Sequence, residues 1–250
     1  MSNPWEWILK AKHYFRRMSY RRRFRELPEI KGGYGAFGQD VLVAELLGKK
    51  RNGVFVDIGA NDGVRVNNSY YFEKELGWTG VAIEPIPAIY QKLTANRKCA
   101  TVNGCMTTKP GKAKFLEMVG GPHMLSTLAI HNEGLTARRL RTNAKRHNTE
   151  IREIEVECLT FAMMAEKFGI HEVDFLSLDI EGGELDILKS IDFERTPVRA
   201  ISVENNYYTR DIRDYLESQG FIYLGTFRVD EIYLFGGNAL RSACRENPAG

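Results

Sequence analysis

The sequence lacks the features that would assign it to several specialised classes of protein. It has no apolar run of about eighteen residues or more, the length that a membrane-spanning helix needs. Its basic N-terminus has neither the apolar core nor the small-residue cleavage site of a secretory signal. Its four cysteines show no CxxC or zinc-type spacing, so neither a disulfide framework nor a metal knuckle is indicated. Together these absences predict a cytoplasmic protein in a reducing compartment.

What is present fits a single α/β domain. The chain has 250 residues, of which 43% are hydrophobic, enough for a sizeable core. Its net charge is +3, and residues 1–25 hold eight Lys or Arg and one acidic residue, a net +7, so the rest carries −4. A mildly acidic body argues against a nucleic-acid groove across the main domain.

The basic N-terminal arm, residues 1–30, is predicted to contain an amphipathic helix. Pro4 suits a first helical position, and apolar residues from Trp5 to Met18 fall along one side. Two interpretations are open. The helix packs on the domain or on the second subunit of a homodimer, or it rests on an anionic membrane face, which would make the protein membrane-peripheral.

After a linker and a lead-in helix over residues 31–52, strands and helices alternate through residues 53–237, and a tail over 238–250 follows. The strands, such as "GVFVDIG", "GVAIEP" and "RAISVEN", are almost continuously apolar, as parallel strands covered on both faces require. The pattern predicts a mostly parallel α/β sheet with helices on both faces and an antiparallel C-terminal hairpin. Ligands of such a sheet bind at the carboxyl ends of its strands.

The loop after the first strand, Asp57-Ile-Gly59-Ala-Asn61-Asp62-Gly63, is the first candidate binding site. Its G-x-N-x-G pattern places Asn61 where the dinucleotide fingerprint needs a glycine to make room for a pyrophosphate. Its two carboxylates would repel a pyrophosphate and attract a cationic ligand. The pattern therefore favours S-adenosylmethionine over NAD.

Glu84 ends the next strand, 21 residues after Gly63. An acidic residue at this point binds a ribose through its two hydroxyl groups. Because both cofactors contain ribose, Glu84 alone does not discriminate between them.

Further acidic residues follow two later strands. Asp179 and Glu181 precede a Gly-Gly turn, and we expect them to point into the crevice, where one of them acts as a base for a hydroxyl acceptor. Asp179, Glu204 and Asn205 end neighbouring strands and offer the oxygen ligands that Mg²⁺ prefers, so a metal site is a second expectation.

The irregular stretch between residues 106 and 150 holds the acceptor contacts in this interpretation. His123 lies in a Gly/Pro-containing loop placed to cover the site, as a candidate catalytic or substrate-contacting residue, and His131 is a weaker one. The basic segment 134–148 is either a solvated helical face or a contact for a phosphate-bearing acceptor.

Four segments carry a resemblance to a known family, and it covers roughly residues 50–235. In order and character they resemble the FkbM-type methyltransferases, which are class I enzymes that use S-adenosylmethionine. These segments are "VFVDIGANDGV", "GWTGVAIEPIPAIYQKLTANR", "TVNGCM" and "VDFLSLDIEGGELDILKSID".

The resemblance implies a seven-stranded Rossmann-like sheet and O-methylation, often of sugars or glycosylated natural products. It implies that the loop residues Asp57, Gly59, Asn61 and Gly63 hold the methionine end of the cofactor. Glu84 would then hold the ribose, and Asn103 and Cys105 would lie near the adenine, although Cys105 departs from the small alanine expected there. The expected acceptor is a glycan; the alternatives are a non-sugar natural product, or a non-catalytic nucleotide-binding module.

Overall fold

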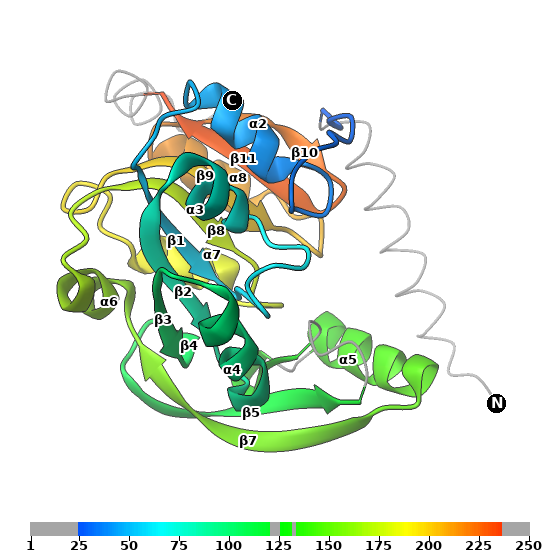
Figure 1. Ribbon diagram of the computed structural model, residues 1–250. Helices are drawn as coiled ribbons and strands as arrows, with labels where there is room; N and C mark the ends of the chain where they lie inside the picture. Colours follow the sequence, from blue (N-terminus) through cyan, green and yellow to red (C-terminus); the bar gives the residue numbers. More distant parts are fainter. Residues whose placement is uncertain (1–24, 121–125, 132–133, 237–250) are drawn as a thin grey trace.

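The computed structural model describes residues 25–120, 126–131 and 134–236 (Figure 1). The expected arm helix up to residue 24 and the tail from residue 237 lie outside them. Among the described helices, none combines the length and the apolar character that crossing a membrane requires. The described residues form two sheets, one of seven strands and one of four.

The seven-stranded sheet confirms the predicted α/β architecture, including the closing hairpin. Its order is β10-β11-β9-β8-β1-β2-β3. All neighbouring pairs from β9 to β3 are parallel, whereas β11 is antiparallel to both β9 and β10. The strands are β1 (Val54–Ile58), β2 (Thr79–Glu84), β3 (Ala100–Asn103), β8 (Val173–Leu178), β9 (Val198–Glu204), β10 (Phe221–Phe227) and β11 (Asp230–Phe235).

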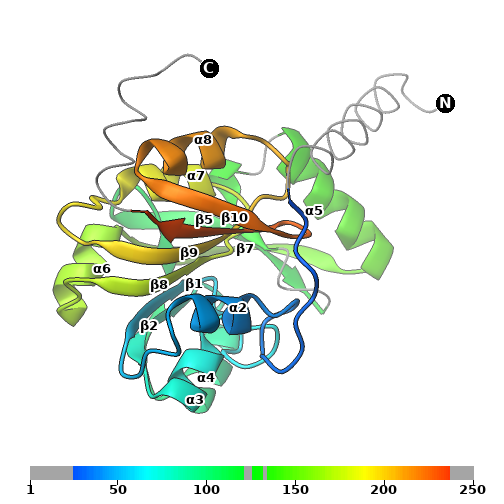
Figure 2. The ribbon, with the colours of Figure 1, turned by 90° about the horizontal axis from the view of Figure 1, so that it is seen from above.

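Helices cover both faces of this sheet (Figure 2). Successive side chains of a strand point to opposite faces, so Phe55 of β1 packs in one core cluster while Val56 and Ile58 pack in another. Because both faces of the sheet are covered, both sets of side chains are mostly apolar. One face carries α2 (Gln39–Leu46), α3 (Tyr70–Leu76) and α4 (Pro87–Asn96), and the other carries α6 (Phe161–Phe168), α7 (Glu184–Ser190) and α8 (Asp211–Ser218).

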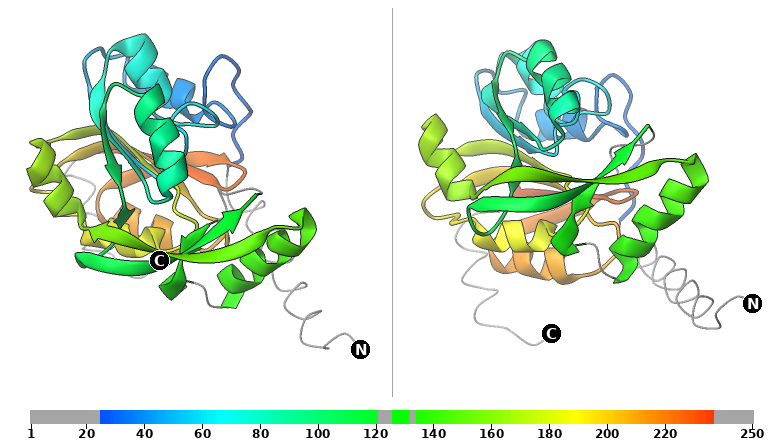
Figure 3. Two further views of the ribbon diagram at one scale, coloured as in Figure 1. Left: turned by 60° about the horizontal axis from the view of Figure 1, so that its bottom comes forward. Right: turned by 90° about the horizontal axis from the view of Figure 1, so that it is seen from below.

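The second sheet is formed within residues 105–159, which include the irregular stretch from 106 to 150 (Figure 3). Its long antiparallel ribbon, β5 (Gly111–Val119) and β7 (Glu150–Leu159), is flanked by β4 (Cys105–Met106) and β6 (Thr127–Leu128). The ribbon alternates apolar and charged residues, and its exposed lysines pair across the strands, as Lys112 does with Glu155 at 2.7 Å. The helical turn η2 (Ala129–His131) and the helix α5 (Gly134–His147) lie between β6 and β7.

The two sheets meet at Gly104. The segment "ATVNGCM" holds two strands rather than one, because β3 pairs with β2 in the first sheet and β4 pairs with β7 in the second. A side chain at Gly104 would place its Cβ 2.7 Å from the carbonyl oxygen of Glu157. The glycine therefore permits the close approach at which the chain changes sheets.

Candidate functional site

A pocket of about 730 Å³ of empty space, partly open to solvent, lies at the carboxyl ends of β1, β2 and β8. The second sheet supplies one apolar wall, with Met106, Phe115 and Leu128. The acidic side chains in its lining are Glu84, Asp179 and Glu181.

The loop after β1 turns back on itself through residues with positive φ. Gly59 has φ +90°, and a Cβ there would overlap the carbonyl oxygen of Asp179. Asn61 has φ 53°, and Gly63 has φ +79° with Leu93 only 2.6 Å from where its Cβ would be. Gly59 and Asn61 line the pocket, whereas Gly63 packs behind it against Leu93. The lack of a side chain at Gly59 thus lets the loop after β1 pack directly against the backbone at the end of β8.

Glu84 is buried at the end of β2, with 6% of its surface exposed, and its carboxylate lines the pocket. One oxygen accepts a hydrogen bond from the Ile86 amide at 2.9 Å, and the other from the Asn61 amide at 3.1 Å. Burial raises the pKa of Glu84 to about 7, against the opposing effect of these two hydrogen bonds. The Glu84 carboxylate is thus held in place by the backbone of the loops after β1 and β2.

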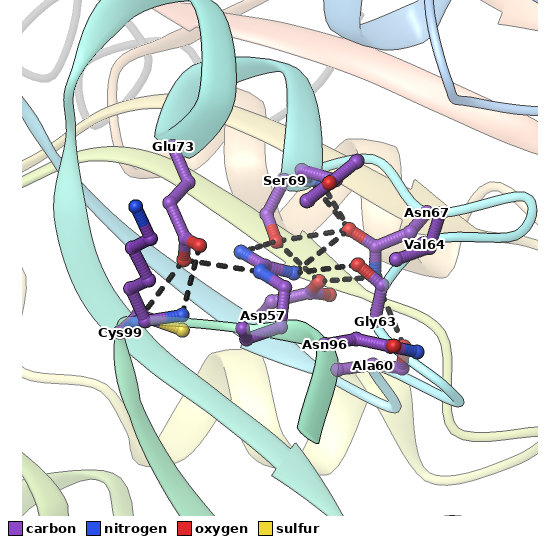
Figure 4. Close-up of polar contacts among 12 residues, drawn as sticks. Asp57, Ala60, Gly63, Val64, Asn67, Ser69, Glu73, Asn96 and Cys99 are labelled. Atoms are coloured by element: carbon purple, nitrogen blue, oxygen red, sulfur yellow. Dashed lines mark hydrogen bonds and ion pairs between the residues drawn. The ribbon is translucent and has the colours of Figure 1, made fainter. Parts of the chain in front are cut away.

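Asp57 is buried beneath the loop and is not in the pocket lining. Figure 4 shows its polar contacts. Its carboxylate accepts hydrogen bonds from Ser69 at 2.6 Å and from Asn67 at 2.8 Å, and Asn67 also donates to the carbonyl of Ala60. Burial raises the pKa of Asp57, while the Ser69 hydrogen bond and the charge of Arg97 oppose that rise. Asp57 therefore ties the loop to the start of α3.

Arg97, just after α4, is a buried cation that the sequence analysis missed. Its guanidinium donates to the carbonyl of Gly63, to Asn67 and to Ser69, and it forms an ion pair with Glu73 at 3.0 Å. Its side chain has no exposed surface. These partners lie 24 to 34 positions away along the chain, so no local motif reveals them.

The charges that favour a cationic ligand lie elsewhere than expected. Asp62 caps its own turn by accepting from the amides of Val64 and Arg65, and Asp57 lies beneath the loop. The carboxylates that line the pocket are those of Glu84, Asp179 and Glu181.

Of the two residues expected near an adenine, Cys105 lines the pocket and Asn103 does not. Burial raises the pKa of the Cys105 thiol, which leaves it neutral. The side chain of Asn103 donates to the carbonyls of Glu84 and Pro85, at 2.9 and 3.0 Å. Asn103 therefore fixes the loop after β2 behind the pocket.

Three carboxylates meet at the ends of β8 and β9. Oxygen atoms of Asp179, Glu181 and Glu204 lie within 4.8 Å of one another. Arg139, from α5, donates to Glu181, and its guanidinium lies 3.9 Å from Glu204. A hydroxyl hydrogen bond between Thr136 and Tyr207, at 2.6 Å, holds the same helix to the loop after β9.

Asp179 and Glu204 act as a coupled pair. Burial raises the pKa of Glu204 well above its usual value, and the charge of Asp179 raises it further. Burial also raises the pKa of Asp179, while a hydrogen bond from the Glu204 carboxyl group and the charge of Arg139 lower it. Glu204 Oε2 is buried and receives no hydrogen bond from a described residue. Two buried carboxylates in contact repel each other, so the pair favours holding one proton, and the stronger rise in pKa favours the protonated form of Glu204.

The expected set of metal ligands is not the set that the structure brings together. The amide of Asn205 donates to the carbonyl of Thr209 at 2.7 Å and to Glu231 at 3.0 Å, and its oxygen accepts from the Thr209 amide. Asn205 is therefore committed to its own turn, and Glu181 takes its place beside Asp179 and Glu204. Because the Arg139 guanidinium already lies among these acids, the group does not fit the Mg²⁺ site that was expected.

The candidate histidines divide between described and undescribed residues. His123 lies outside the described residues. His131 packs over the Gly-Gly turn, where a Cβ at Gly183 would lie 2.5 Å from its Nε2 atom. Burial lowers the pKa of His131, against the opposing charge of Asp186. The two glycines therefore make room for an imidazole ring that covers the turn next to Glu181.

Comparison with protein families gives a match over residues 57–223 to the family described as Methyltransferase FkbM domain. Comparison with curated proteins gives no match. Among solved structures, the METTL16 MTase domain in crystal form 2 is 12% identical with a TM-score of 0.42, over 80% of this chain and 66% of that one. A human methyltransferase 10 domain containing protein is 13% identical with a TM-score of 0.41, over 91% of this chain and 98% of that one.

Proposed function

This chain belongs to the FkbM family of methyltransferases, and we propose that it transfers a methyl group to a hydroxyl of a carbohydrate or glycoconjugate. The observation that supports this most strongly is the pairing of two acidic sites across one pocket. Glu84 lies at the end of β2, and Asp179 lies at the end of β8, beside the loop that carries Gly59. The first site suits a ribose, and the second suits an acceptor hydroxyl.

The pocket lining fits S-adenosylmethionine, the cofactor that membership of this family implies. The carboxylate of Glu84 can accept from both ribose hydroxyls, as acids at this position do. The wall formed by Met106, Phe115 and Leu128 suits a flat apolar ring such as adenine. The carboxylate of Asp179 provides negative charge for the sulfonium of S-adenosylmethionine, a charge that S-adenosylhomocysteine lacks.

In the proposed reaction, bound S-adenosylmethionine supplies the methyl group and departs as S-adenosylhomocysteine. Asp179 accepts the proton of the attacking hydroxyl, because its raised pKa makes it a stronger base than an exposed aspartate. Glu204 orients Asp179 through their shared hydrogen bond, and Arg139 holds Glu181 at the rim of the site. No step passes through a metal ion, and EDTA treatment is expected to leave the rate unchanged.

A methyl-transfer assay with radiolabelled S-adenosylmethionine and a panel of free and conjugated sugars tests the proposal. Label in a sugar product that withstands both mild base and acid hydrolysis would support an ether at a hydroxyl, because base would release a methyl ester and acid would release a methyl glycoside. Label only in a non-sugar natural product would replace the acceptor and keep the chemistry. Tight cofactor binding without transfer to either class would favour a non-catalytic module.

A further inference from the structure

Helix α5 is strongly basic within an otherwise acidic body. It carries five Lys or Arg and no acidic residue. The chain has a net charge of +3, residues 1–25 carry +7 and α5 carries +5, so the remaining residues carry −9. A positive helix on a negative body points to an anionic partner.

The helix presents three faces with separate tasks. Leu140 and Ala144 are buried in a cluster with residues of β5 and β7, and Ala137 is buried as well. Thr136 and Arg139 reach the loop after β9 and the acidic group. The side chains left over form what we call the basic face of α5: Arg138, Arg141, Lys145 and Arg146.

Among the described residues, none of the four side chains of the basic face has an ion-pair partner. Arg138, Arg141 and Lys145 succeed one another at spacings of three and four, at which like charges on a helix repel. The helix dipole favours cations in the last turn, which accounts for Lys145 and Arg146 but not for the two arginines in the middle. The exposed lysines of the neighbouring ribbon differ, since Lys114 pairs with Glu153 at 2.8 Å.

The basic face adjoins the acceptor side of the pocket. Arg139 lies in the acidic group, and Arg146, seven residues later, lies on nearly the same side of the helix, about 10 Å along its axis. Arg138 is the immediate neighbour of Arg139. An acceptor whose hydroxyl reaches Asp179 would thus extend along α5.

We propose that the basic face of α5 binds a phosphate group carried by the acceptor, so that the acceptor is a phosphorylated sugar or a sugar nucleotide. The planar guanidinium of arginine matches the oxygens of a phosphate with paired hydrogen bonds. The acceptor part of this inference rests on the proposed function. Phosphate binding itself can be measured without methyl transfer.

The test is calorimetric titration of the full chain with inorganic pyrophosphate in low-salt buffer without divalent cations. Two double variants are compared: Arg138→Gln/Arg141→Gln in the basic face, and Lys112→Gln/Lys114→Gln in the paired ribbon. Both remove two positive charges from exposed or half-buried sites, one pair on α5 and the other on β5. Each protein is also titrated with S-adenosylhomocysteine, which reports an intact cofactor side.

We expect the parent and the ribbon variant to bind pyrophosphate equally, and the α5 variant to bind it at least about tenfold more weakly, the loss of one charged interaction. Added salt should weaken binding in the parent. Equal binding by the two variants, or none by the parent, would overturn the inference. Binding of phosphatidylserine vesicles through α5, without binding of pyrophosphate, would also overturn it. If the parent does not bind S-adenosylhomocysteine, that result would count against the proposed function and not against phosphate binding by α5.

Discussion

The two sides of the pocket balance their buried charges differently. On the cofactor side, Asp57 accepts two hydrogen bonds and lies beside the buried cation Arg97, which itself makes four polar contacts. On the acceptor side, three carboxylates share one guanidinium, and Glu204 Oε2 receives no hydrogen bond from a described residue. The first arrangement is complete as it stands. The second has capacity left for a ligand.

This difference indicates how work is divided between the two sides. A fully bonded network holds the loop after β1 rigid before any cofactor arrives, so little ordering cost remains at binding. An under-compensated acidic group stabilises the fold less, but it keeps a carboxylate available to accept a proton. Substitutions on the two sides should therefore separate stability from turnover.

The largest expected effect belongs to the acceptor side. Asp179→Asn removes the base and should lower turnover by about 10²- to 10⁴-fold, while affinity for S-adenosylhomocysteine stays close to that of the parent. Asp214→Asn, at an exposed site of α8, is the matched control. Initial rates and calorimetry measure the two quantities. A variant with parental turnover would remove Asp179 from the mechanism.

The next effect belongs to the cofactor side and concerns stability. Arg97→Met leaves Asp57 and Glu73 buried without their cation, and breaking such a pair costs about 3–5 kcal/mol in the free energy of unfolding. Urea denaturation measures it, with Lys114→Gln, an exposed and paired lysine, as an unchanged control. A loss of no more than about 1 kcal/mol, as for a surface ion pair, would contradict the role of Arg97.

Glu84→Gln should weaken S-adenosylhomocysteine binding by about 10- to 100-fold, because hydrogen bonds to a charged group contribute about 1.5–3 kcal/mol. Ribose hydroxyls favour the ionised form of Glu84, whose pKa is about 7 in the free protein. Parental affinity should therefore rise about tenfold between pH 6 and pH 8, and the profile of the variant should be flat. Glu166→Gln, exposed on α6, controls for charge. A pH-dependent profile in the Glu84 variant would exclude this assignment.

The smallest effect is expected for Glu204→Gln, since an amide can donate to Asp179 as the protonated acid does. The free energy of unfolding at pH 7 should change by no more than about 1 kcal/mol. The folded-state pKa of Glu204 lies above its unfolded value, so its protonation stabilises the fold at low pH and that contribution is lost as the pH rises. The variant should therefore lose less stability than the parent toward alkaline pH. Severe destabilisation at pH 7 would mean that Glu204 is ionised.

The parts of the fold that the sequence predicted are those built from locally visible patterns. Strands β1, β2, β8 and β9 are mostly apolar because both of their faces are covered. The ribbon of β5 and β7 was missed because one face is solvated and charged, which makes "EIREIEVECL" read as irregular polar sequence.

The site shows the same limit. Glu84 and the Gly59 loop were predicted because Glu84 is the last residue of its strand and the loop directly follows β1. Arg139 contacts Glu181 across 42 positions of sequence, and only the fold brings them together. Asn205 was misassigned because its side chain forms hydrogen bonds with the backbone of Thr209. Its position at the end of an apolar strand does not reveal these bonds.

The most direct test of the central claim is a parallel calorimetric titration of the full chain with S-adenosylhomocysteine and with NAD. We expect saturable binding of S-adenosylhomocysteine that weakens in Glu84→Gln. We expect no binding of NAD, because Asn61 and the acidic lining leave no place for a pyrophosphate between β1 and β2. Binding of NAD without binding of S-adenosylhomocysteine would contradict it.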